Sequence, residues 1–171
     1  MRPRHMLLAF SAVALLAAVS VPGALGETRK CTGTFNGTVR LDNVKVPRGA
    51  TCILNGTRVK GNIKVGEDAT LIATNVKVGG NIQAKEHAQV TVVGLLTKVG
   101  GSVQLVEGTN AVLTQIRVKG DIQLFENVGV NAVTSNRIDG NLQCKENVPD
   151  PVGAGNIVQG NAEDQCEDLE T

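Results

Sequence analysis

The chain has 171 residues, of which 42% are hydrophobic and only 2% are aromatic, and its formal net charge is +1. This near balance of charge argues against nucleic-acid binding and against a general attraction to acidic membranes. With three Phe, no Tyr and no Trp, the chain also lacks the aromatic bulk that fills the centre of a compact globule.

The N-terminal segment has the features of an export signal. Two arginines precede residues 6–19, which are almost wholly apolar, and small residues follow. The apolar stretch is shorter than the roughly 20 residues that span a bilayer. We therefore expect a signal peptide over residues 1–26, removed after Gly26 or else after Ala24, and a secreted mature protein without a membrane anchor.

A repeat of about 20 residues fills the mature chain. Each copy centres on a glycine, with apolar residues two positions before it and two positions after it. The glycines are Gly61, Gly80, Gly101, Gly120, Gly140 and, in a degenerate copy, Gly160. Their spacings of 19, 21, 19, 20 and 20 residues keep strands in register while turns absorb the differences.

A second alternating run begins eight residues after four of these glycines and predicts a second short strand in each coil. The residues expected to face inward are Ala69, Leu71 and Ala73, then Ala88, Val90 and Val92, then Thr109, Ala111 and Leu113, then Val128, Val130 and Ala132. One coil cannot bury its apolar face against an ordering cost of about 1.5 kcal/mol per residue. Stacked coils share a core and overcome that cost.

The pattern therefore predicts an all-β protein, a right-handed parallel β-helix or solenoid. About six coils of about 20 residues are expected over residues 27–148. An irregular last coil and an acidic cap are expected over residues 149–171. A helical fold is excluded because no segment holds a 3.6-residue period. A left-handed hexapeptide helix is disfavoured because the repeat is not a multiple of six.

The four cysteines provide an independent check on the coil length. An even number in an exported protein indicates disulfides. Cys31 and Cys52 are 21 residues apart, and Cys144 and Cys166 are 22 apart. Residues one coil apart lie about 4.8 Å from one another, within the range that a disulfide accepts. We expect bonds Cys31–Cys52 and Cys144–Cys166, one at each end of the stack, where such caps argue against end-to-end growth.

Two stretches near the C-terminus carry a resemblance. Residues 140–147, Gly-Asn-Leu-Gln-Cys-Lys-Glu-Asn, and residues 163–166, Glu-Asp-Gln-Cys, resemble a group of uncharacterised secreted bacterial proteins, chiefly actinobacterial. The coil pattern is also loosely similar to bactofilins, which are right-handed β-helices that form polymers. The first resemblance implies a secreted solenoid without an established activity, and the second implies self-assembly.

Stacking turns each repeat position into a column, and three columns carry the candidate functional side chains. A basic column, three residues before the glycines, contains Arg58, Lys77, Lys98, Arg117 and Arg137. An acidic column, six residues after them, contains Glu67, Glu86, Glu107, Glu126 and Glu146. A glutamine column lies three residues after the central glycine in each of the last four complete repeats. It contains Gln83, Gln104, Gln123 and Gln143.

Each column has a structural and a functional interpretation. The glutamines are expected to form a hydrogen-bonded stack of amides. The glutamates are expected to bond turn amides and extend into solvent, with divalent cation binding as the alternative. The basic column is expected to be a solvated face. Its functional alternatives are an anionic polymer, such as a teichoic acid or acidic glycan, and the glutamates of a second copy.

No catalytic constellation is present in the mature chain. His87 is its one histidine and is expected to be exposed at a turn, and no zinc-protease or Ser-His-Asp pattern occurs. No cofactor is expected. The sequence therefore predicts a non-catalytic structural or binding module, in the medium or at the cell wall. A self-assembling polymer and a carbohydrate-active β-helix enzyme are the second and third alternatives.

Overall fold

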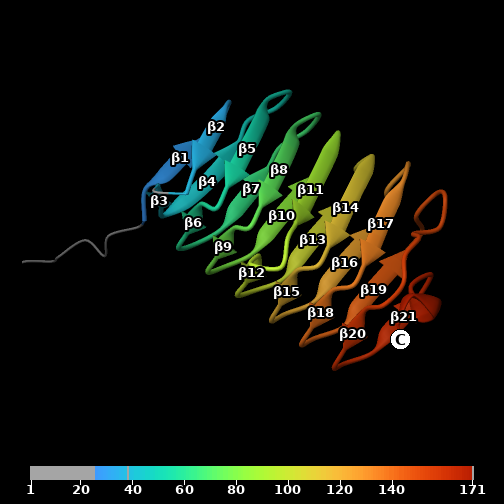
Figure 1. Cartoon of the computed structure of the whole chain (residues 1–171). Coiled ribbons are helices and arrows are strands. Elements are labelled where there is room, and N and C mark those ends of the chain that lie inside the picture. Colours follow the sequence, from blue (N-terminus) through green and yellow to red (C-terminus); the bar gives the residue numbers. More distant parts are fainter. Residues whose placement is uncertain (1–25, 38, 171) are drawn as a thin grey trace, which may run out of the picture.

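The computed structural model describes residues 26–37 and 39–170 of the chain as a parallel β-solenoid (Figure 1). The predicted fold class is confirmed, with about seven turns of about 19 residues where about six turns were expected. The expected signal peptide lies outside the described residues, apart from Gly26. Within the described part, no helix is long and apolar enough to cross a membrane.

Three parallel sheets form the faces of the solenoid. Sheet A contains β1 (Thr28–Lys30), β4 (Asn43–Val46), β7 (Ile63–Val65), β10 (Ile82–Lys85), β13 (Val103–Val106), β16 (Ile122–Phe125), β19 (Leu142–Lys145) and β21 (Ala162–Asp164). Sheet B contains β2 (Thr34–Asn36), β5 (Thr51–Asn55), β8 (Thr70–Thr74), β11 (Gln89–Val93), β14 (Asn110–Thr114) and β17 (Asn131–Thr134). Sheet C contains β3 (Arg40–Leu41), β6 (Arg58–Val59), β9 (Lys77–Val78), β12 (Lys98–Val99), β15 (Arg117–Val118), β18 (Arg137–Ile138) and β20 (Ile157–Val158). A short 3-10 helix, η1 (Glu167–Leu169), follows β21.

Each regular coil has three strands, whereas the sequence predicted two. The expected strand through the central glycine is divided by a bend. β9 ends at Val78, β10 begins at Ile82, and the residues between them turn the corner from sheet C to sheet A. Val78 and Ile82 are both buried, so the alternation correctly predicted the inward side chains and missed the corner between them.

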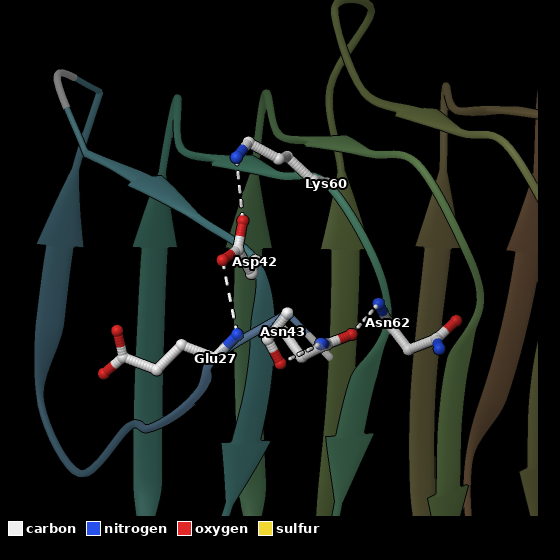
Figure 2. A network of polar contacts seen from close by, with 6 residues as sticks. Glu27, Asp42, Asn43, Lys60 and Asn62 are labelled. Carbon is white, nitrogen blue, oxygen red and sulfur yellow. Dashed lines mark hydrogen bonds and ion pairs between the residues drawn. The ribbon is translucent and has the colours of Figure 1, made fainter. Parts of the chain in front are cut away.

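The glycine at this corner is required by a column of side-chain oxygens. Each oxygen accepts a hydrogen bond of 2.8–3.0 Å from a backbone N–H one coil further along. The acceptors are Asn43, Asn62, Asn81, Ser102, Asp121 and Asn141. A Cβ at the next glycine would overlap that oxygen, as at Gly101 beneath Asn81. Figure 2 shows the first bond of the column, between Asn43 and Asn62.

One coil departs from the predicted register, and in the coil before it Thr109, which was also expected inside, is exposed. Val128 and Val130 were expected inside, but they are 60% and 59% exposed. Asn131 and Val133 face the core in their place. The step from Ala111 to its partner Asn131 is 20 residues, compared with 19 from Leu71 to Val90. The extra residue lies in the turn before β17, and a slip of one residue moves every side chain to the opposite face.

Both predicted disulfides are present, each with a Cα–Cα distance of 5.3 Å. The expected reason was incomplete, because the bonded cysteines are not direct neighbours in one column. Cys144 pairs in register with Asp164, two residues before Cys166. All four cysteines are fully buried, so each bond lies inside one end of the core rather than on a strand edge.

A glycine-to-alanine pair tests the role of the corner. Gly101→Ala should lower the free energy of unfolding by about 1–3 kcal/mol, because its Cβ would overlap the Asn81 oxygen and the backbone of Gly80. Gly33→Ala is the matched control, since a Cβ at Gly33 meets open space. Denaturant unfolding should separate the two variants. Equal stabilities would contradict the requirement for glycine at the corner.

Candidate functional site

The basic column forms an uninterrupted row on the outer face of sheet C. Register pairs join all five predicted residues one coil apart and add Arg40 beyond Arg58. Arg40 was not predicted, because its step to Arg58 is 18 residues and the first corner has no glycine. In each of the strands β6, β9, β12 and β15 the second residue is a buried valine, so the cation before it must point outward.

An open groove of about 480 Å³ follows this row of cations. Gly79 and Gly100 lie two residues after Lys77 and Lys98, the middle members of the column, and add no side chain to the lining of the groove. Lys60 and Lys119 hold the equivalent positions in the flanking coils and add two further cations to the lining. The described residues that line the groove include no carboxylate, histidine, serine or cysteine side chain.

Most cations of this row have no ion-pair partner. Across residues 26–37 and 39–170, no carboxylate lies within 4.0 Å of Arg40, Arg58, Lys77, Lys98 or Arg117. Arg137, at the end of the row, lies 3.8 Å from Asp139. Like charges at this spacing repel by about 1 kcal/mol per neighbouring pair in water. The unpaired middle of the row is therefore a surface that an anion would stabilise.

An ion-pair network holds Lys60, a lining residue near the N-terminal end of the groove (Figure 2). Asp42 lies 2.8 Å from the Lys60 ammonium and accepts a hydrogen bond of 3.3 Å from the backbone N–H of Glu27. Lys60, and after it the Glu27 N–H, hold the pKa of Asp42 below its usual value. Asp42 thus offsets the charge of Lys60, whereas the column members Arg40 and Arg58 have no such carboxylate partner among the described residues.

The acidic column lies at the turn between sheets A and B, and cations lie within 4.0 Å of four of its five glutamates, Glu126 being the exception among the described residues. Arg48 lies 2.8 Å from Glu67, and Lys85 lies 3.2 Å from Glu107 and 3.6 Å from Glu86. Glu107, followed by Glu86, raises the pKa of Lys85. The expected hydrogen bonds to turn amides are not formed by these carboxylates in the described part of the chain.

Glu67 differs from the rest of the acidic column in its backbone conformation. Glu86, Glu107, Glu126 and Glu146 adopt left-handed backbone angles, with φ between 53° and 57°. In the Glu67 coil, Asp68 adopts this conformation in place of the glutamate. Among the described residues, no group of three or more His, Cys, Asp or Glu side chains could hold a metal ion. The geometry of this column therefore gives no argument for a cation site.

The glutamine column is a continuous chain of amide hydrogen bonds, as predicted. The Nε2 groups of Gln83, Gln104 and Gln123 each donate to the Oε1 of the next glutamine, at 2.8–2.9 Å. Gln143 then donates to Glu163 Oε2 at 2.7 Å, a continuation that the sequence analysis missed. The amides satisfy one another, which confirms the structural interpretation of this column.

His87 is buried, contrary to the exposed position that was expected. Its side chain is 1% exposed, and neither ring nitrogen makes a hydrogen bond of normal geometry in the described part of the chain, although the Asn110 backbone lies near the ring. Burial lowers its pKa to about 4. The ring fills the space over Gly108 at the corner where later coils have Asn127 and Asn147. His87 therefore belongs to the core, and no acid or nucleophile is hydrogen-bonded to it.

Comparisons with known proteins give no family for this chain. Protein-family models, curated proteins and solved structures were searched, and none of them matches. The chemistry of the surface is therefore the guide to function, and the unpaired cations of sheet C are its most distinctive feature.

His87 should make the stability of the fold depend on pH. The neutral ring is favoured when folded, with a pKa of about 4, against about 6.5 when unfolded. Stability should be full above pH 6.5 and decline as the pH falls, by about 3 kcal/mol at pH 4. His87→Asn, which introduces the residue of the later coils, should remove this part of the decline.

Denaturant unfolding of both proteins between pH 7 and pH 4 measures the difference. Carboxylates titrate in both proteins and cancel in the comparison. Parallel stability curves for the two proteins would contradict a buried, neutral His87.

Proposed function

We propose that the protein is a secreted, non-catalytic binding module that holds a linear anionic polymer along sheet C. The observation that carries this proposal is the row of five cations, from Arg40 to Arg117, that stack in register without carboxylate partners beside an open groove. The two disulfides support secretion, because such bonds persist in oxidising compartments. A groove lined only by cations, glycine and valine favours binding over catalysis.

The geometry favours a polymer over a small anion. A single exposed ion pair contributes only about 0.2–1 kcal/mol. The row repeats at the strand spacing of about 4.8 Å, so a ligand with anionic groups along its length can engage several cations at once. The backbone under each cation is fixed by the parallel ladder, which limits the entropy lost on binding. Arginine and lysine both occur in the row, and arginine can hold phosphate or carboxylate through two hydrogen bonds.

The shared ligand chemistry is a linear chain with closely spaced phosphate or carboxylate groups. A glycerol-phosphate teichoic acid represents the phosphate class, and a polyuronate represents the carboxylate class. Binding to one of these polymers and not to the other would assign the class. Failure to bind either polymer at low salt would overturn the proposal.

Neutralising the middle of the row should weaken binding specifically. Lys98→Gln/Arg117→Gln should reduce affinity at least tenfold, and the slope of log K against log salt should fall in magnitude by about 1–2. Lys45→Gln/Lys64→Gln is the matched control, because it removes the same charge from the outer face of sheet A. Titration calorimetry at several salt concentrations gives both quantities. An equal loss in the control would show that only net charge matters, which would contradict a site on sheet C.

A further inference from the structure

Charge is separated along the axis of the solenoid, although the whole chain is nearly neutral. Residues 26–66, at the N-terminal end, contain eight basic and two acidic residues. Residues 139–170, at the C-terminal end, contain one basic and eight acidic residues. Residues 67–138 contain six of each. Seven rungs of about 4.8 Å place the ends roughly 34 Å apart, beyond the Debye length of about 10 Å at 0.1 M salt. Each end therefore presents its own charge.

The N-terminal end presents an open, basic strand. Among the described residues, β1 has a strand neighbour on one side only, and Thr28, Arg29 and Lys30 are all exposed. Arg29 pairs in register with the buried Val44, so it stands on the core-facing column of sheet A. Its guanidinium lies 5.8 Å from the centre of the Phe35 ring. A cation thus covers the end of the apolar core.

The C-terminal end presents an acidic surface. β21 is the other edge strand of sheet A, and it carries Glu163 and Asp164. η1 follows and buries Leu169 against the core, while its Glu167 and Asp168 are exposed. The disulfides do not obstruct either end, because all four cysteines are buried.

The outward column of sheet A connects the two ends and changes sign along its length. In register order it contains Lys30, Lys45, Lys64, Gln83, Gln104, Gln123, Gln143 and Glu163. If a second copy continued the stack in register, its Lys30 would lie one rung beyond Glu163 of the first copy. The column would then pass from one molecule to the next through an ion pair.

We propose that copies of this chain associate head to tail, with the basic N-terminal end of one against the acidic C-terminal end of the next. The two surfaces differ, so the contact is heterologous and does not close unless the stack curves into a ring. Sheet C stays exposed in such a stack, and the basic grooves of successive copies are brought into line. This association is independent of polymer binding, and it replaces the expectation that capped ends prevent growth.

A charge swap tests the proposal. Sedimentation velocity of the purified protein should show concentration-dependent assembly at low salt, where the Debye length is about 30 Å, and loss of assembly at about 1 M salt, where it is about 3 Å. Lys30→Glu/Lys45→Glu should remain monomeric, and so should Glu163→Lys/Asp168→Lys. An equimolar mixture of the two variants should assemble again, because the glutamates introduced at the N-terminal end of one variant meet the lysines introduced at the C-terminal end of the other.

Control variants distinguish this contact from other modes of association. Lys98→Gln/Arg117→Gln should assemble like the unchanged protein, even where it no longer binds polymer. Glu107→Gln/Glu126→Gln should also assemble, because a side-by-side contact through the acidic column is not required. If Glu163→Lys/Asp168→Lys fails to fold, Glu167→Lys/Asp168→Lys replaces it and keeps the Gln143–Glu163 hydrogen bond. A monomer at low salt, or a variant mixture that stays monomeric, would overturn the proposal.

Discussion

The distance of one rung between coils, about 4.8 Å, is the constraint on which this structure depends. It places every side chain directly beside its counterpart in the next coil, so each position must be compatible with a copy of its own type. Amides meet this condition well, as the bonds from Gln83 to Gln143 show. The corner oxygens meet it only because glycine leaves room for them, as at Gly101. The same spacing makes a column of like charges costly unless something else compensates the charge.

The two charged columns meet this cost in different ways. Four of the five glutamates, all but Glu126, lie beside lysine or arginine side chains that offset their charge, with Lys85 shared between two of them. The left-handed backbone of Glu86, Glu107, Glu126 and Glu146 does not itself favour glutamate, since glycine and asparagine adopt it most readily. At the other left-handed corner the residue varies among Gly56, Asn75, Gln115 and Ser135. The basic column lacks such partners over most of its length, and this asymmetry points to sheet C rather than to the glutamates as the ligand-binding face.

The sequence predicts the interior of this fold better than its corners. Alternation identified Val78 and Ile82 as inward residues. The three residues of the bend between them keep the two positions an even number apart, so both side chains still face the core. Alternation cannot locate a residue inserted into a turn, which is why Val128 and Val130 were assigned to the wrong face. His87 was expected outside for a related reason. Polarity alone does not show that a corner above a glycine has room for a buried ring.

The members of the basic column were predicted in the coils that have a corner glycine. The member in the first coil, which has no corner glycine, was not predicted. Arg40 extends the basic column through a corner that is one residue shorter, so no sequence spacing reveals it. The axial separation of charge, in contrast, is present in the sequence but hidden by total composition. In a solenoid, contacts join neighbouring coils, and position in the sequence is therefore position along the axis. A running sum of charge thus describes a real surface in this fold, whereas in a compact globule distant segments mix and the same sum has no spatial meaning.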